Sequence, residues 1–370
     1  MIAVILCGFG YTLLLLWWSR GWKRALPDQR SPSESSGSTP FVSVVIAVRN
    51  ESANIPLLIE SLRQQSYPAS SCEWILVDDH STDETYGLLL REKDLRMHTV
   101  RLDTGQKGKK AALSAGIRIS RGEWIVTTDA DCRLHPDWLT YLVRFGESKH
   151  AEMVCGLVAC EVEKKFLHEF QAMEIALLQV CGAGSLAQDF PLLNTGASLA
   201  FKKATWNEVS GYDSHRNISS GDDTFLMLDF SRFFPGRVRP QVSVESIVWT
   251  HPVDSWYSLF QQRLRWMSKT RHYRLGYIHL SGLIISLSAM SYVGSFILCF
   301  AYPSARVVFF LLFLLRVLPE LYLLKLWKRN SGQNFSLHIV LLMSFLYPFF
   351  MTVLMFAGPF MRLEWRGRDL

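Results

Sequence analysis

The amino-acid sequence predicts an α/β domain with a mainly parallel sheet, flanked at both ends by transmembrane helices. Three observations support this fold class. Short apolar runs alternate with helical patterns in the middle of the chain, as in parallel sheets whose faces are covered by helices. Hydrophobic residues make up 49% of the 370 residues, and the mean hydropathy is +0.12. Long uncharged stretches lie near both ends of the chain.

Residues 1–19 are expected to form an N-terminal membrane anchor. They carry no charged side chain, and they are followed by four basic residues: Arg20, Lys23, Arg24 and Arg30. A signal peptide has the opposite polarity, with its positive charge before the apolar core. The sequence therefore predicts an uncleaved helix whose basic flank lies in the cytoplasm, together with the domain that follows.

Residues 28–40 are rich in Ser and Pro, so they are expected to link the anchor to a domain over residues 41–253. The runs expected to be strands are Phe41–Val48, Glu73–Val77, Met97–Leu102, Glu123–Thr128 and Met153–Val162. The patterns with helical spacing are Glu51–Gln65, a helix beginning near Glu84, Lys109–Ser120 and His135–Gly146. Parallel sheets bind their ligands beyond the carboxyl ends of the strands.

The region 276–361 is expected to be a second membrane region. Three segments are long and apolar enough to span a bilayer: Leu275–Ala305, Val307–Leu326 and Phe335–Met361. The middle segment contains Arg316 and Glu320, which lie about one helical turn apart and can therefore pair away from lipid.

Three crossings would place Arg362, Arg366 and Arg368 outside the cell, against the positive-inside rule. A hairpin at Pro348 would remove the conflict, and so would a C-terminal segment that lies in the interface. The sequence leaves both solutions open.

The charge and the cysteine content indicate which partners, metals and cellular compartment suit the chain. The net charge is +6, and the basic residues lie mostly beside apolar segments, so they suit lipid headgroups better than nucleic acid. The seven cysteines include no C-x-x-C pair, which argues against zinc and a disulfide framework. Free thiols are typical of a domain in a reducing cytoplasm.

Two acidic motifs follow expected strands. Asp129 and Asp131 would point the same way on an extended backbone, and carboxylates suit Mg²⁺ or Mn²⁺, which could neutralise a diphosphate leaving group. Asp78 and Asp79 could accept hydrogen bonds from a nucleobase or a ribose. The alternatives are solvated turns for the first motif and helix capping for the second, where Asp83 is the expected cap.

Three further motifs carry weaker signals. The Gly-rich entry to the helix at Lys109 could receive a phosphate, or it could be a solvated basic loop without the spacing of a Walker motif. The small residues around Gly196 would let a substrate approach the backbone, or they form a plain turn. Asp222 and Asp223 begin a helical pattern, where they either complement the helix dipole or supply a general base.

Residues 254–275 mix aromatic and basic side chains, as expected of a helix that lies at the surface of anionic lipid. This interpretation does not require the particular spacing of Gln262, Arg265 and Trp266. The segment is therefore expected to be amphipathic and interfacial, and to carry a further motif.

Taken together in this order, the motifs resemble the D,D,D,QxxRW pattern of family 2 glycosyltransferases in their membrane-bound, cellulose-synthase-like branch. The resemblance covers about residues 41–268 and begins at Val44–Glu51, which resembles the first strand and the N-E turn of the family. It implies a GT-A fold, Rossmann-like with a mainly parallel sheet. It also implies inverting transfer from a nucleotide-sugar donor, here a UDP- or GDP-sugar.

The resemblance also implies roles for individual residues. Donor binding would involve Glu51, Asp78, Asp79, Lys109 and Asp129. The metal, Mg²⁺ or Mn²⁺, would be held by Asp131 with Asp129. The catalytic base would be Asp223 with Asp222 beside it. The acceptor and diphosphate side would involve Gln262, Arg265 and Trp266, to which we add Gly196.

We therefore expect a hexosyltransferase in a membrane, such as a bacterial inner membrane, acting at the cytoplasmic face on a lipid, lipid-linked or saccharide acceptor. The alternatives are a processive polysaccharide synthase, a catalytically silent membrane scaffold with the same fold, and a nucleotidyltransferase. Fewer membrane segments are expected here than in a typical polymer-secreting synthase. No nucleic-acid partner is expected, and the oligomeric state is left open.

Overall fold

The computed structural model describes residues 1–26, 39–94, 96–163, 165–215, 221–273, 275–358, 361, 364–365 and 368–369. Most of the linker expected at 28–40 lies outside the described residues, as do Arg362 and Arg366. The chain divides into two compact units. The sheet unit contains residues 23–161 and 182–251, and the helical unit contains residues 1–22, 162–181 and 252–370.

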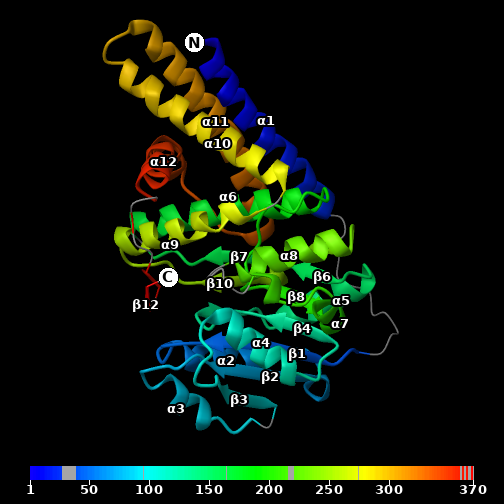
Figure 1. Ribbon diagram of the computed structural model, residues 1–370. Coiled ribbons are helices and arrows are strands. Elements are labelled where there is room, and N and C mark those ends of the chain that lie inside the picture. Colours follow the sequence, from blue (N-terminus) through cyan, green and yellow to red (C-terminus); the bar gives the residue numbers. More distant parts are fainter. Residues whose placement is uncertain are drawn as a thin grey trace. The chain divides into compact units, whose positions relative to one another are not determined.

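The sheet unit is built on a seven-stranded sheet with the order β3-β2-β1-β4-β8-β6-β9 (Figure 1). Its strands are β1 (Val42–Val48), β2 (Cys72–Asp78), β3 (Met97–Arg101), β4 (Trp124–Thr127), β6 (Met153–Cys155), β8 (Leu199–Lys202) and β9 (Val238–Pro240). The strands β1 to β4 are parallel to one another, and only β8 runs antiparallel to its neighbours β4 and β6. The predicted α/β class with a mainly parallel sheet is thus confirmed.

The helices of this unit are α2 (Ile55–Arg63), α3 (Thr85–Leu90), α4 (Lys109–Ile119), α5 (Trp138–Ser148), α7 (Lys203–Glu208) and α8 (Asp222–Phe233). Short 3-10 turns lie at Ala69–Ser71, Asp213–His215 and Val244–Ser246. A smaller sheet joins β5 (Cys132–Arg133), β10 (Ile247–Thr250) and β7 (Leu157–Cys160). Apart from the strand expected over Met153–Val162, the expected strands and helices are present, with ends shifted by a few residues.

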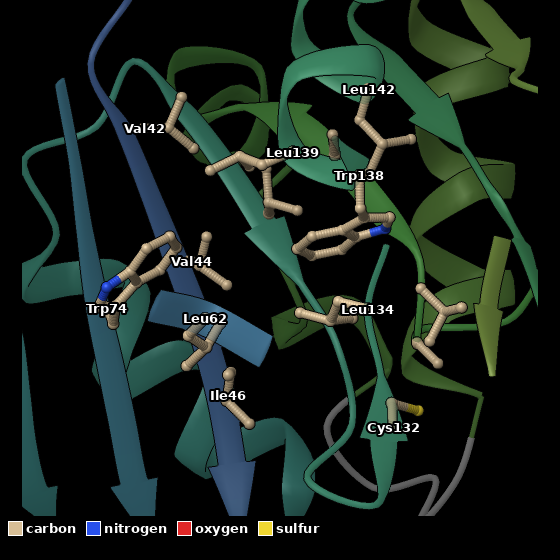
Figure 2. Packing of buried hydrophobic residues seen from close by; sticks show 14 of the residues in the cluster. Val42, Val44, Ile46, Leu62, Trp74, Cys132, Leu134, Trp138, Leu139 and Leu142 are labelled. Carbon is tan, nitrogen blue, oxygen red and sulfur yellow. The ribbon is translucent and has the colours of Figure 1, made fainter. Parts of the chain in front are cut away.

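Alternation along β1 divides the core between the two faces of the sheet. On one face, Val44 and Ile46 pack with Trp74, Leu62 and residues of α5 (Figure 2). On the other face, Val45 belongs to a second buried cluster that includes residues of α4 and α8. Because both faces are covered, the central strands are continuous apolar runs.

The strand expected over Met153–Val162 is wrong as a single element. The chain forms β6 and β7, which belong to different sheets and are separated by Gly156. The backbone N–H of Gly156 donates to the Ser198 carbonyl at 2.8 Å, and a Cβ on residue 156 would stand 2.1 Å from Ser198 Oγ. A glycine is needed for this close approach.

The helical unit contains most of α1 (Ile2–Ala25) and most of α6 (Phe166–Leu186), together with α9 (Trp256–Ser268), α10 (Gly276–Leu298), α11 (Pro303–Ser331) and α12 (Leu337–Ala357). It also holds a 3-10 turn at Thr270–His272 and the short strands β11 (Glu364–Trp365) and β12 (Arg368–Asp369). Among the described helices, α1, α10, α11 and α12 are long and apolar enough to cross a membrane. These are the segments expected from the sequence.

Two details of the helical unit differ from expectation. The helix α12 continues through Pro348, so the hairpin proposed there is wrong. The helix α6 was not expected at all. Its apolar residues are spread around the helix without a clear period, so the usual signal of an amphipathic helix is missing.

The predicted pairing of Arg316 with Glu320 is confirmed, with 3.1 Å between Nη2 and Oε1 and both side chains buried. Glu320 also accepts hydrogen bonds from the hydroxyls of Tyr11, at 2.7 Å, and Ser344. These contacts join α1, α11 and α12 through one carboxylate. Ionisable residues in membrane segments commonly pair in the interior of a bundle in this way.

We predict that Gly116→Ala destabilises the protein. Gly116 lies where α4 meets the sheet, and a Cβ there would stand 2.5 Å from Val45 Cγ1 and 3.0 Å from Val77 Cγ2. Overpacking of about 1–3 kcal/mol should outweigh the gain in helix propensity, which is at most about 1 kcal/mol. Thermal unfolding of the purified chain in detergent measures the difference. The control is Gly105→Ala, which meets no heavy atom of the described residues within 4 Å. Equal melting temperatures for the two variants would contradict the prediction.

Candidate functional site

The strand ends bring two of the acidic motifs to one edge of the sheet. Asp78 is the last residue of β2, Asp79 follows it, and Asp129 lies two residues beyond the end of β4. Because β2, β1 and β4 are parallel neighbours, their carboxyl ends share that edge. This is where ligands of such sheets bind.

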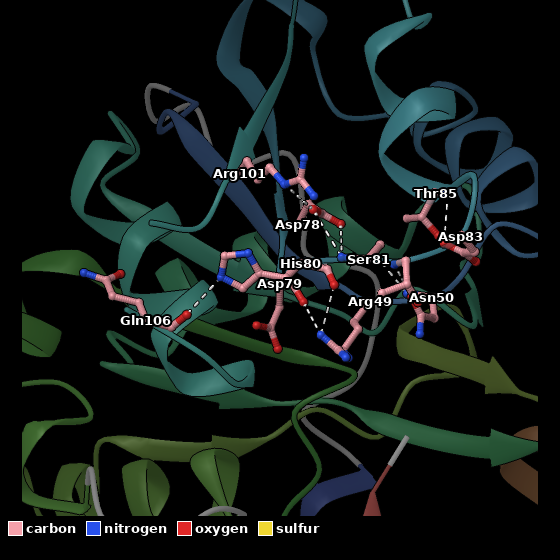
Figure 3. Close-up of polar contacts among 11 residues, drawn as sticks. Arg49, Asn50, Asp78, Asp79, His80, Ser81, Asp83, Thr85, Arg101 and Gln106 are labelled. Atoms are coloured by element: carbon pink, nitrogen blue, oxygen red, sulfur yellow. Dashed lines mark hydrogen bonds and ion pairs between the residues drawn. The ribbon is translucent and has the colours of Figure 1, made fainter. Parts of the chain in front are cut away.

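Asp78 and Asp79 are both buried but have different partners (Figure 3). Asp78 accepts from the Ser81 backbone N–H, 3.2 Å from its Oδ1, and its Oδ2 lies 3.5 Å from Arg101 Nε. Asp79 Oδ2 accepts from the Gly108 N–H at 3.0 Å. Asp79 is thus joined to the loop that leads into α4, whereas Asp78 supports the turn after β2.

The turn after β2 is held in an uncommon conformation. His80 has φ of +55°, a left-handed conformation that few non-glycine residues adopt. Arg49 Nη1 donates to the carbonyls of Asp79 at 2.6 Å and His80 at 3.1 Å, and His80 Nε2 lies 3.0 Å from the Gln106 carbonyl (Figure 3). These contacts fix Asp79 between β1 and the loop before α4.

Asp83 and Glu51 have structural partners at helix starts. Asp83 accepts from the N–H of Thr85, the first residue of α3, and from Ser52 N–H. Burial raises the pKa of Asp83, but the hydrogen bonds from Thr85 and Ser52 outweigh it and lower the pKa to about 2. The buried Glu51 accepts from Asn54 Nδ2 at 2.8 Å, just before α2.

Lys109 is the cation that lies between Asp129 and Asp222. It is the first residue of α4, after Gly108 with φ of +93°. Its Nζ lies 2.6 Å from Asp129 Oδ1 and 3.6 Å from Asp222 Oδ2. Burial lowers the pKa of Lys109, but Asp129, Asp222 and Asp223 together raise it well above its ordinary value. The side chain is therefore an ammonium at physiological pH.

Gly196 connects this cluster to the second acidic pair. Its N–H donates to Asp223 Oδ2 at 3.0 Å, and its carbonyl accepts from Thr127 Oγ1 at 2.9 Å. A Cβ on residue 196 would stand 3.4 Å from both Lys109 Nζ and Asp222 Oδ2. A glycine at 196 thus leaves the space beside the ammonium open.

The backbone around Asp131 differs from the extended conformation assumed for the D-x-D motif. The strand β4 ends at Thr127, and Ala130 and Asp131 form a turn in which Cys132 N–H donates to the Asp129 carbonyl at 3.3 Å. The extended backbone expected across Asp129 and Asp131 is therefore wrong. Cys132 Sγ lies 3.7 Å from Asp131 Oδ1.

The donor atoms of this motif fit a hard divalent cation. Asp129 and Asp131 offer carboxylate oxygens, which Mg²⁺ and Mn²⁺ prefer. In the part of the chain that the structure describes, no group of three or more His, Cys, Asp or Glu side chains could hold a metal. Two carboxylates suffice for an ion of this kind when substrate phosphates and water complete its shell.

Gln262, Arg265 and Trp266 lie on α9, in the helical unit. Between them is Arg263, whose Nη1 donates to Gln262 Oε1 and whose guanidinium lies 4.1 Å from the Trp266 ring centroid. Sequence reasoning missed Arg263. The available signal was Glu174, an acidic residue in a long apolar stretch that needs a basic partner.

Family models match most of the chain. Residues 124–361 match the family model for glycosyl transferase family group 2, and residues 43–174 match the model for glycosyl transferase family 2. The chain belongs to this group of glycosyltransferases. The cellulose-synthase-like branch is a finer assignment and stays an expectation.

The relatives include a probable glycosyltransferase, YdaM, of Bacillus subtilis (strain 168), 24% identical over 66% of this chain and 58% of that protein. A beta-monoglucosyldiacylglycerol synthase of Nostoc sp. is 35% identical over 39% of this chain and 32% of that protein. The chain thus spans no more than 58% of these relatives.

A solved structure of similar fold is the mannosyltransferase PcManGT from Pyrobaculum calidifontis, in complex with GDP-Man and Mn²⁺. The match covers 97% of each chain, with a TM-score of 0.55 and 17% sequence identity. At this identity the likeness shows the fold, so the expected GT-A fold is confirmed.

We predict that Lys109→Gln destabilises the protein by about 1.5–3 kcal/mol at neutral pH, because hydrogen bonds to charged groups are lost and the aspartates repel one another. The pKa of Lys109 is higher in the folded protein than its unfolded value of 10.5, so its contribution to the free energy of unfolding is fully present below that pH. The stability lost in the variant should therefore be constant between about pH 6 and 9. Melting temperatures across this pH range measure the loss. The control is Lys107→Gln, at an exposed residue of the same loop. A variant as stable as wild type, or a loss that changes across this range, would contradict the prediction.

Proposed function

We propose that the chain is an inverting hexosyltransferase that moves a sugar from a UDP- or GDP-sugar to a lipid, lipid-linked or saccharide acceptor at the cytoplasmic face of a membrane. The observation that carries the proposal is the contact of Lys109 with both Asp129 and Asp222. It joins the motif after β4 to the acidic pair at the start of α8. Membership of the glycosyltransferase family supports the class of reaction.

The donor would bind along the edge of the sheet. Asp78 and Asp79 are proposed to contact the nucleoside, with Glu51 supporting the neighbouring turn. When the donor binds, the positively charged ammonium of Lys109 would contact one of the donor's phosphates and Asp129 less closely than before. This role agrees with its place at the start of α4, where backbone N–H groups favour phosphate.

A divalent ion, Mg²⁺ or Mn²⁺, would be held by Asp129 and Asp131. When bound, it would neutralise negative charge on the departing diphosphate. The complex of PcManGT with GDP-Man and Mn²⁺ supports this assignment in a protein of similar fold.

Asp223 is proposed as the base that takes the proton from the acceptor hydroxyl. Its Oδ2 accepts from Gly196 N–H at 3.0 Å and its Oδ1 from Thr224 N–H at 2.5 Å, so its orientation is fixed. The acceptor oxygen then bonds to the anomeric carbon while the bond from that carbon to the diphosphate breaks on the opposite face. Asp222, next to Lys109, would keep the local charge balanced.

Gln262, Arg265 and Trp266 are proposed to serve the acceptor side, with Arg265 supporting the diphosphate. We propose the layout expected from the sequence: an anchor at 1–19, a linker at 28–40, a catalytic domain at 41–253, an interfacial segment at 254–275 and a membrane region at 276–361. The four candidate spanning helices and the diacylglycerol named in the Nostoc relative support a lipid acceptor in a membrane.

We predict that Asp223→Asn lowers kcat about 10²–10⁴-fold, because the amide cannot accept the proton. The amide oxygen can still accept from Gly196, so affinity for the donor nucleotide should be unchanged. Initial rates and calorimetric titration with UDP and GDP separate the two effects. Asp213→Asn, at an exposed residue before α8, is the control. Wild-type turnover by Asp223→Asn would reject this base assignment.

The product distinguishes the proposed function from its alternatives. Membranes that contain the chain are incubated with labelled UDP-glucose, UDP-galactose, UDP-N-acetylglucosamine and GDP-mannose, and the lipids are extracted. We expect one labelled sugar per lipid and release of nucleoside diphosphate. A ladder of lengths would indicate a processive synthase, and pyrophosphate a nucleotidyltransferase. Absence of metal-dependent UDP or GDP binding would indicate a silent scaffold.

A further inference from the structure

Arg263 is a buried cation inside the motif on α9. It is 3% exposed, and Leu259, Gln261 and Leu264 are the other buried residues of this helix. Its partner Glu174 lies on α6 and is 4% exposed. The two helices lie side by side in the helical unit (Figure 1). A buried pair of this kind requires an explanation, because removing two charges from water is unfavourable.

The carboxylate of Glu174 is shared between two helices. Arg263 donates to its Oε2 through Nε, at 2.7 Å, and through Nη2. Tyr347 of α12 donates its hydroxyl to the other oxygen, Oε1, at 2.9 Å. Both oxygens are therefore used, and the plane of the guanidinium is set by Glu174 because two of its nitrogens bond to the same carboxylate.

The remaining side of the guanidinium faces the motif. Its Nη1 donates to Gln262 Oε1, and its carbon lies 4.1 Å from the centroid of the Trp266 ring. Arginine stacks on aromatic rings in this way, with an attraction that grows when both groups are removed from water. One side chain thus contacts both the first and the last residue of the motif.

The start of α9 is attached to the same helix. The side-chain amide of Gln171 donates to the Val253 carbonyl and accepts from the Val253 N–H, each at 2.9 Å. Further along, the rings of Phe170 and Trp256 meet edge to face with centroids 5.2 Å apart. The helix α6 therefore holds α9 from its first turn to the motif, and Glu174 is the last of these contacts.

We propose that Glu174 and Arg263 are positioning residues for the acceptor motif. Glu174 orients Arg263, and Arg263 in turn fixes the amide of Gln262 and the ring plane of Trp266. Through Tyr347 the same carboxylate connects the motif to α12, a candidate membrane helix. The inference rests on the proposed function, in which Gln262 and Trp266 contribute to acceptor binding.

A purely structural ion pair and a positioning pair can be distinguished by a variant that removes both charges and keeps the fold. Removing one partner of either kind leaves a buried charge and destabilises the fold, so single deletions do not distinguish them. Replacing both partners by apolar residues of similar volume is often neutral for stability. The informative variant is therefore Glu174→Leu combined with Arg263→Met, which removes the charges and also the guanidinium that contacts the motif.

The test uses the full chain in detergent, with the labelled nucleotide sugar that wild type uses and dioleoylglycerol as acceptor. We expect the double variant to melt within a few degrees of wild type and to bind UDP or GDP equally well. Its kcat/KM for the acceptor should fall at least tenfold. Arg263→Lys keeps the charge opposite Glu174 but loses the planar guanidinium, so its kcat/KM for the acceptor should also fall. Glu169→Gln, a partly exposed position on α6, is the matched control and should keep wild-type kinetics.

Wild-type kcat/KM for the acceptor in a stable double variant, or in Arg263→Lys, would overturn the inference. Gln262→Ala and Trp266→Ala separate this failure from a failure of the proposed function. If these two variants lose acceptor transfer while the Arg263 variants do not, only the positioning role is wrong. If these two variants transfer normally, the role proposed for the motif itself is wrong.

Discussion

The sheet unit depends on the balance between one ammonium and several carboxylates. Asp129 is far in the sequence from the adjacent Asp222 and Asp223, and without Lys109 the repulsion between the two segments would oppose the packing of α8 near β4. The same balance suits a site that receives a diphosphate and a divalent ion, since these add charges of both signs. The arrangement therefore connects the stability of the fold with the chemistry proposed for it.

The sequence predicts the fold class and the strand ends well, because buried parallel strands leave continuous apolar runs that stop at acidic residues. Asp78 and Asp129 fall beyond such runs, and the structure places them at one sheet edge. The pairing of Arg316 with Glu320 was also predictable, because helical spacing alone brings the two side chains together.

Other features depend on contacts between distant residues and could not be read locally. The break at Gly156 follows from the approach of Ser198, and the turn at Asp131 follows from β5 pairing with β10 in a second sheet. The helix α6 lacks an apolar period, so the helix is not evident from the sequence. Glu174 indicates that a basic partner exists, but only the tertiary fold shows that this partner is Arg263. The convergence of Asp222 and Asp223 on Lys109 likewise requires the tertiary fold.

The contact between Tyr11 and Glu320 shows that the first helix does more than attach the chain to a membrane. A helix that only tethers a domain to lipid could be exchanged for any other hydrophobic segment of equal length. Here α1 supplies a hydroxyl to a carboxylate that is buried among α11 and α12, and Thr12 adds a bond from its Oγ1 to the Leu315 carbonyl at 2.6 Å. The amino-terminal segment is thus an integral part of the bundle, and versions of the protein shortened for soluble production would lose an internal partner as well as a tether.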